Sequence, residues 1–176
     1  MYPTVERVGG LDREAFVQHF GSLFEHSPWV AERAWRQRPF GTVEELEQAF
    51  TAAVFSATEA EQLSLIRSYP DLAGSEAADG TLTAASVDEH ASAGLDRLTR
   101  GEHERLERLN AAYRERFGMP LVFCSREHTK ESILAEGEAR LAHGRAQEVS
   151  TALAEIAKIG RLRLLDRVRP GEEAVR

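Results

Sequence analysis

Apolar residues recur along most of this chain at the spacing of an α-helix, and this pattern constrains the fold more than any other feature. Phe16, Phe20, Leu23 and Phe24 stand at offsets 0, 4, 7 and 8, so they would form one apolar stripe. The same spacing recurs within residues 43–54, 106–117 and 149–159. Alternating strand patterns are almost absent. The sequence therefore predicts an all-α fold of about eight helices.

Several expected helix starts carry a capping residue. Thr42–Glu45 and Thr58–Glu61 have the pattern of a capping box, in which the threonine and glutamate side chains each accept a backbone hydrogen bond. Ser27 before Pro28 is typical of an N-cap followed by proline at the first helical position. A helix is expected to end at Tyr69, before Pro70. Others are expected from about Thr83 to Gly94, from 130 to 143 and from 145 to 168.

The length of 176 residues and a hydrophobic fraction of 42% fit one compact domain. We expect this domain to span residues 1–168 and a frayed C-terminal tail to span 169–176.

Charge and composition narrow the expected partners. The net charge is −7 with both signs interleaved, which argues against nucleic acid as a partner. No apolar run approaches the roughly 20 residues that span a bilayer. With no secretory or peroxisomal pattern at either end, we expect a cytoplasmic protein. Cys124 is the only cysteine, so an internal disulfide is excluded, and such a thiol is usually a small buried apolar group.

The stretch from Arg67 to Leu95 concentrates polar side chains at two helix ends joined by a loop. This arrangement would place Tyr69, Ser86, Glu89 and His90 around a small polar pocket. Structural alternatives exist for each residue. Ser86-x-x-Glu89 also fits a capping box, Tyr69 fits a half-buried tyrosine, and His90 fits a surface histidine.

The motifs in this stretch resemble the family of 2-oxo-4-hydroxy-4-carboxy-5-ureidoimidazoline (OHCU) decarboxylases. Residues 67–74 read Arg-Ser-Tyr-Pro-Asp-Leu-Ala-Gly, and residues 82–95 read Leu-Thr-Ala-Ala-Ser-Val-Asp-Glu-His-Ala-Ser-Ala-Gly-Leu. Further matches are at residues 27–30, 38–40, 110–120, 140–141 and 148–164. The resemblance implies a helical fold, a homodimer and the cofactor-free decarboxylation of OHCU to (S)-allantoin in urate breakdown.

The resemblance also implies which residues form the site. Tyr69 stands where the family has its catalytic histidine, Glu89 matches the family's glutamate, and His90 stands where the family has glutamine. The expected substrate-binding residues are Pro70, Ser86, Val87, Asp88, Leu121, Val122, Phe123, Cys124, Ser125 and Arg163. Residues 121–125 would hold the substrate through backbone groups. The local pattern allows another reading of Arg163, as part of a solvated basic face.

The two departures from the family pattern bear directly on the chemistry. A tyrosine has an unperturbed pKa near 10, against about 6.5 for histidine, so Tyr69 is a poor general base at neutral pH. Our hypothesis is that the histidine has changed places: His90 moves the proton, and Tyr69 orients the substrate. Decarboxylation needs no metal or cofactor here, because the substrate's own imine and carbonyl groups accept the electrons. One alternative is a non-catalytic member that binds a ureide or scaffolds a purine-catabolic partner, and another is an enzyme for a related heterocycle.

Overall fold

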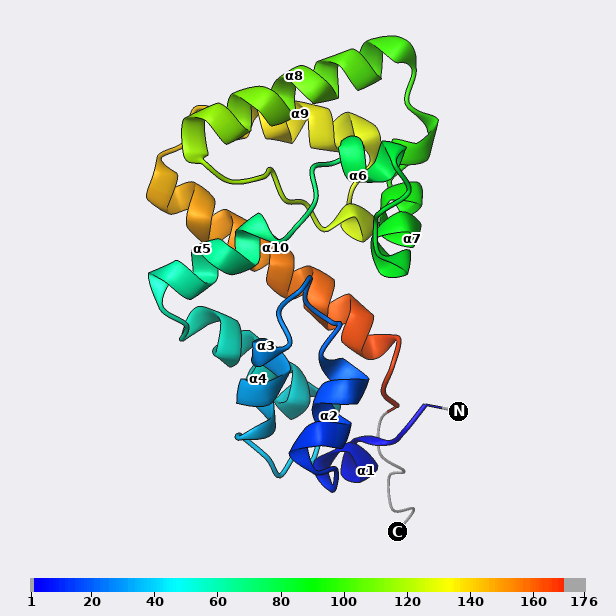
Figure 1. Ribbon diagram of the computed structural model, residues 1–176, viewed down its shortest axis with the longest axis vertical. Helices are drawn as coiled ribbons and strands as arrows, with labels where there is room; N and C mark the ends of the chain where they lie inside the picture. Colours follow the sequence, from blue (N-terminus) through cyan, green and yellow to red (C-terminus); the bar gives the residue numbers. More distant parts are fainter. Residues whose placement is uncertain (1, 170–176) are drawn as a thin grey trace. The chain divides into compact units, whose positions relative to one another are not determined.

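The computed structural model describes residues 2–169, in which every regular element is a helix (Figure 1). Within that range it contains ten α-helices and two short 3-10 helices. The elements are α1 (Val5–Gly9), α2 (Arg13–Phe20), α3 (Trp29–Trp35), α4 (Val43–Phe55), α5 (Glu59–Arg67), α6 (Ser75–Ala78), α7 (Ala84–Ser92), η1 (Leu95–Arg97), α8 (Arg100–Phe117), η2 (Ser125–Glu127), α9 (Lys130–Arg140) and α10 (Arg145–Leu165). The predicted all-α class is confirmed, and the short α1 and α6 account for the difference from about eight helices.

The threonine caps form largely as predicted, whereas the serine cap does not. Thr58 accepts from the Glu61 amide at 3.3 Å, and Glu61 accepts from the Thr58 amide at 2.9 Å. At Thr42 only half of the predicted box forms, because the Glu45 carboxylate accepts from the amide of Gly41. The prediction for Ser27 is wrong: its hydroxyl donates to the carbonyl of Glu25 at 2.8 Å, and α3 begins without a side-chain cap.

The described residues form two compact units, which divide the chain within α5 and within α10. Among the described residues, one unit takes 2–65 and 157–169, and the other takes 66–156. The single domain over residues 1–168 stays a prediction. Of the tail expected at 169–176, only Arg169 lies among the described residues, where its amide donates to the carbonyl of Pro3. No helix within the described residues is long and apolar enough to cross a membrane.

The first unit is built around a cluster of phenylalanine rings. The four residues of the predicted stripe are all buried, but α2 ends at Phe20, so Leu23 and Phe24 lie in the turn after the helix and not on it. The rings of Phe16 and Phe50 stack 5.9 Å apart, which joins α2 to α4. Phe24 stacks on Phe50 at 6.1 Å. On the α10 side, a Cβ atom placed on Gly160 would lie 2.4 Å from the Phe24 ring, so only glycine allows this close packing.

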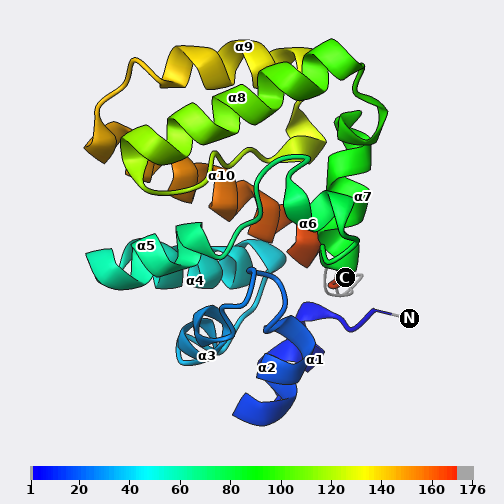
Figure 2. The ribbon, with the colours of Figure 1, turned by 45° about the horizontal axis from the view of Figure 1, so that its top comes forward.

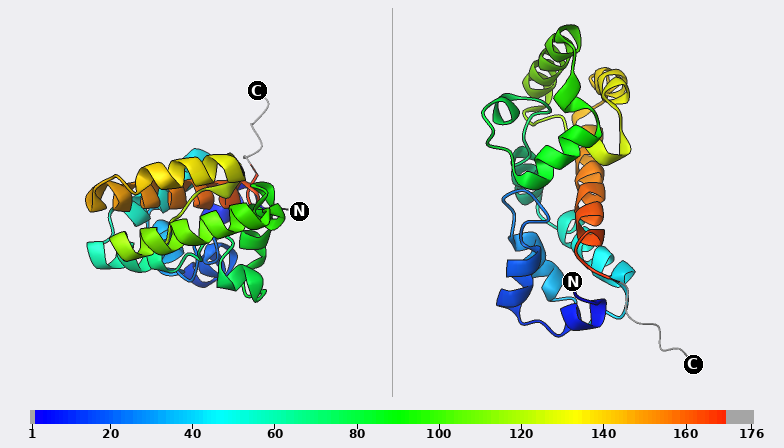
Figure 3. Two further views of the ribbon diagram at one scale, coloured as in Figure 1. Left: turned by 90° about the horizontal axis from the view of Figure 1, so that it is seen from above. Right: turned by 90° about the vertical axis from the view of Figure 1, so that its right-hand side faces the viewer.

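The second unit is dominated by α8 and α9, which lie side by side (Figure 2). The view from above shows the same pairing (Figure 3, left). An ion pair between Arg105 and Glu138, with nitrogen–oxygen distances of 2.5 and 2.6 Å, joins the two helices on the exposed side. The buried face of α8 carries Leu106, Leu109, Tyr113 and Phe117, as the apolar spacing predicts. This unit contains the loop after Tyr69, helix α7 and the segment 119–125.

Candidate functional site

Helix α7 presents three buried polar side chains. Its N-cap is Thr83, whose hydroxyl accepts from the amide of Ser86 at 3.3 Å. The alternative in which Ser86 caps the helix and pairs with Glu89 is therefore wrong, because Ser86 already lies in the first turn. Ser86 is 4% exposed, and Glu89 and His90 are each 9% exposed.

The burial of both Glu89 and His90 excludes the reading of His90 as a surface histidine. Adjacent helical residues point about 100° apart, so α7 must be covered over a wide arc. Val87 is half-exposed and Asp88 is exposed, which places them on the solvent side of α7. Their expected role in substrate binding stays a prediction.

The segment from Leu121 to Ser125 is buried throughout and lies next to α7. All five residues are at most 4% exposed, and Cys124 is buried as predicted. The 3-10 helix η2, which begins at Ser125, packs against α7. A hydrogen bond of 2.9 Å from the amide of Lys130 to the carbonyl of Ala93 ties the end of α7 to the start of α9. The structure thus brings together two of the expected site elements.

Tyr69 and Pro70 open the loop that follows α5. Tyr69 is 6% exposed and its hydroxyl oxygen is buried, so the reading of a half-buried tyrosine with a surface hydroxyl is wrong. Just before it, the Arg67 guanidinium donates to the carbonyl of Gly118 at 3.0 Å. This contact ties the Tyr69 loop to the start of the segment that contains residues 121–125.

Arg163 belongs to the first unit and is only 4% exposed. Its guanidinium donates to the carbonyl of Leu23 at 3.1 Å and forms an ion pair with Glu25 at 2.9 Å. The reading of Arg163 as solvated surface is therefore wrong. Its contact with substrate stays a prediction.

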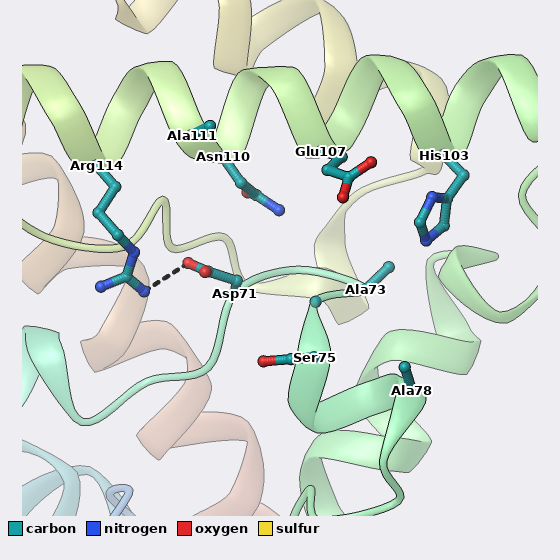
Figure 4. A pocket seen from close by; sticks show the side chains of 10 residues that line it. Asp71, Ala73, Ser75, Ala78, His103, Glu107, Asn110, Ala111 and Arg114 are labelled. Carbon is teal, nitrogen blue, oxygen red and sulfur yellow. Dashed lines mark hydrogen bonds and ion pairs between the residues drawn. The ribbon is translucent and has the colours of Figure 1, made fainter.

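A pocket of about 470 Å³ lies between α8 and the residues that follow Pro70 (Figure 4). Asn110, Glu107 and His103 project from α8 towards Ala73 in the loop and Ser75 at the start of α6. At one side an ion pair of 2.7 Å joins Arg114 to Asp71. None of the expected site residues lines this pocket, which instead adjoins the loop that carries Tyr69 and Pro70.

A buried charge network stands beside the segment 121–125, and the sequence did not single it out. Glu148 is fully buried and accepts from Arg140 at 2.8 Å and from the Tyr113 hydroxyl at 2.5 Å. Burial, followed by the hydrogen bond to Glu148, raises the pKa of the Tyr113 phenol. A usable signal was present: Asn110 and Tyr113 put polar groups into an otherwise apolar stripe, which indicates specific buried partners.

Glu89 and His90 on α7 can perform proton chemistry, and both are largely shielded from water. A carboxylate and an imidazole are among the side-chain groups that most often act as general bases and acids, and α7 presents one of each. The neighbouring segment supplies backbone donors and acceptors, which suit a small polar ligand. Among the described residues, no cluster of three or more histidine, cysteine, aspartate or glutamate side chains has the arrangement of a metal site.

Comparison with known proteins gives one consistent relationship. A family model described as OHCU decarboxylase matches residues 10–165. The 2-oxo-4-hydroxy-4-carboxy-5-ureidoimidazoline decarboxylase of Haloferax volcanii is 45% identical over 164 residues, which cover 93% of this chain and 95% of that protein. The putative enzyme of the same name from Homo sapiens is 44% identical over 165 residues, covering 94% of this chain and 95% of that protein.

Two solved structures share the fold. The crystal structure of (S)-allantoin synthase matches with a TM-score of 0.76 and 28% identity, over 95% of this chain and 54% of that chain. A crystal structure of OHCU decarboxylase in the presence of (S)-allantoin matches with a TM-score of 0.66 over 89% of this chain and 97% of that chain. At 18% identity, the second match speaks for the fold alone.

Proposed function

Because the chain belongs to the OHCU decarboxylase family, we propose that it decarboxylates 2-oxo-4-hydroxy-4-carboxy-5-ureidoimidazoline to (S)-allantoin in urate degradation. The observation that carries this proposal is the family match over residues 10–165. A relative that bears the decarboxylase name is 45% identical over almost the full length. The protein is then a carbon–carbon lyase.

The reaction demands little beyond orientation and one stereospecific protonation. When the carboxylate leaves as carbon dioxide, the bond electrons pass into the neighbouring imine of the ring. A proton must then be added to the ureido-bearing carbon on one face, while the ring hydroxyl becomes a carbonyl. The substrate supplies its own electron sink, so we propose that no cofactor takes part.

We assign the proton work to α7 and the binding work to its surroundings. Glu89 and His90 are the acid–base residues, and Tyr69 orients the substrate with its hydroxyl, because a phenol donates a hydrogen bond but is a poor base at neutral pH. The burial of His90 supports this assignment. The binding residues are Pro70, Ser86, Val87, Asp88, Leu121, Val122, Phe123, Cys124, Ser125 and Arg163.

Tyr69 also favours a second candidate function. If no other group replaces the family's histidine, the protein binds a ureide or scaffolds a partner of purine breakdown without catalysis. The buried hydroxyl of Tyr69 fits this reading too, because a tyrosine side chain fills more space than a histidine. For either function we propose a homodimer in the cytoplasm, as family members are commonly homodimers.

The test is circular dichroism during turnover. The unstable substrate is generated in place from urate with urate oxidase and hydroxyisourate hydrolase, and the protein is then added. Spontaneous decay gives racemic allantoin, which has no dichroic signal, so the proposal predicts a fast rise of the (S)-allantoin signal. A signal no faster than that with heat-denatured protein would reject catalysis and favour the binding function.

A further inference from the structure

The Arg140–Glu148 ion pair is buried. Stability alone does not explain why two charged residues occupy this place. Arg140 is 5% exposed and Glu148 is 0% exposed. Removing two charges from water is costly, and apolar residues of similar volume would often serve stability as well. A second oxygen of Glu148 lies 2.7 Å from the half-buried His143, so the carboxylate has partners on both sides. Both oxygens of the Glu148 carboxylate therefore have hydrogen-bond partners.

The guanidinium of Arg140 reaches beyond Glu148 to the segment 121–125. It donates to the carbonyl of Val122 at 2.9 Å and lies 4.8 Å from the centre of the Phe123 ring. A second buried carboxylate, Glu155, accepts from the amide of Cys124 at 2.7 Å. Charged side chains from α9 and α10 thus hold the segment at two backbone positions, 122 and 124.

The residue between these two positions is left available to a ligand. The Phe123 backbone forms no hydrogen bond within the part of the chain that the structure describes, although the residue is 4% exposed. Buried backbone groups are rarely left without a partner, since each costs free energy. A polar ligand would supply that partner. Conversely, the Val122 carbonyl and the Cys124 amide are already engaged by protein groups.

We propose that Arg140 and Glu148 are positioning residues that fix the 121–125 segment so that the Phe123 backbone is held for the substrate. This inference rests on the proposed function for the identity of that substrate. Neither residue touches the reacting atoms. Glu148 and the Tyr113 hydroxyl hold the guanidinium, and the guanidinium holds the Val122 carbonyl.

The informative substitution is Arg140→Lys, which keeps the positive charge but replaces a planar fork by a single ammonium group. A lysine cannot reproduce the contacts with Glu148 and Val122 together. We expect KM to rise and kcat/KM to fall by on the order of 10²-fold, because small misplacements of a substrate have effects of that size. We also expect the excess of (S)-allantoin in the enzymatic product to fall, since a loosely held substrate is protonated on both faces.

The matched control is Arg105→Lys, in the exposed Arg105–Glu138 pair of the same unit. It should leave KM and the enantiomeric excess unchanged. Partial unfolding lowers the active fraction and hence kcat, but it changes neither KM nor the enantiomeric excess of the enzymatic product once the spontaneous racemic background is subtracted. If Arg140→Lys does not fold, Tyr113→Phe removes one hydroxyl from the network and should change KM and enantiomeric excess in the same direction.

A binding measurement separates this proposal from the proposed function. Calorimetric titration with (S)-allantoin should show an affinity about tenfold weaker for Arg140→Lys than for wild type. If wild type binds (S)-allantoin but shows no turnover, the proposed catalysis is rejected and the positioning role is not. The ratio of the wild-type affinity to that of Arg140→Lys would then decide the positioning role. Unchanged KM, enantiomeric excess and affinity in a folded Arg140→Lys variant would overturn the positioning role. Absence of both wild-type binding and turnover would overturn it too.

Discussion

The side-chain amide of Asn110 donates a hydrogen bond of 2.9 Å to the backbone carbonyl of Leu72, which joins the buried face of α8 to the loop that begins at Tyr69. Asn110 is 7% exposed, so water does not compete for this contact. This contact and the Arg114–Asp71 ion pair together attach the loop to α8.

Replacing Asn110 by leucine should destabilise the protein at nearly constant side-chain volume. The change leaves the Leu72 carbonyl without its donor, which costs about 1–3 kcal/mol. Urea unfolding would measure the loss of free energy. Glu107→Gln, on the exposed side of the same helix, is the control and should change stability by less than about 0.5 kcal/mol. Equal effects of the two substitutions would show that the hydrogen bond contributes nothing.

His90→Gln should lower turnover by on the order of 10²- to 10⁴-fold, the usual contribution of a general acid or base. The reason is that glutamine keeps hydrogen-bonding groups but carries no titratable proton. The rise of the (S)-allantoin dichroic signal measures the rate. His103→Gln, which changes an exposed histidine of α8, should have no effect. Undiminished turnover in His90→Gln would contradict the hypothesis that the catalytic histidine has moved from position 69 to position 90.

A double variant tests the same hypothesis in the opposite direction. Tyr69→His combined with His90→Gln restores the family pattern at both positions. If the histidine has changed places, the double variant should regain most of the turnover that His90→Gln alone has lost. If the loss of turnover in the double variant is the product of the losses in Tyr69→His and His90→Gln, the two positions act independently. That result would argue against an exchange of roles, because the effects of coupled residues are non-additive.

The sequence predicts the helical class and most helix positions, because local capping and apolar spacing determine both. Helix α7 begins at Ala84, close to the start expected near Thr83, and the stripe on α8 is buried as expected. The burial of His90 could not be predicted, because it depends on which elements pack against α7, and one of them, η2, comes from a distant part of the chain. The Arg140–Glu148 pair was missed for a similar reason: in the sequence each residue resembles an ordinary charged residue on a helix.

A fall in pH should weaken the N-terminal cap of α5, in which Thr58 and Glu61 exchange hydrogen bonds. The hydrogen bond from Arg33, with those from Thr58, lowers the pKa of the Glu61 carboxyl from 4.5 to about 2. A carboxyl whose pKa is lower in the folded state stabilises that state above the unfolded value of 4.5. This contribution is lost as pH falls from there towards 2.

Glu61→Gln should therefore lower the Tm at pH 7, and its difference from wild type should narrow as pH is lowered below 4.5. Thermal unfolding followed by circular dichroism between pH 7 and pH 3 would measure both curves. Glu59→Gln is the control, because Glu59 forms no hydrogen bond or ion pair through its side chain among the described residues. A Tm difference that stays constant with pH would contradict the assignment to Glu61.

Two glycine-to-alanine substitutions should have opposite signs. At Gly160 the new methyl group would lie 2.4 Å from the Phe24 ring, which is 2% exposed and stacked on Phe50, so the ring has little room to move. Overpacking of this kind costs about 1–3 kcal/mol, and the clash should outweigh the gain in helix propensity of up to about 1 kcal/mol. At Gly101, near the start of α8, nothing lies within 4 Å, so only the gain remains. Urea unfolding should show Gly160→Ala less stable and Gly101→Ala slightly more stable than wild type, and a stabilised Gly160→Ala would mean that the Phe24 ring yields.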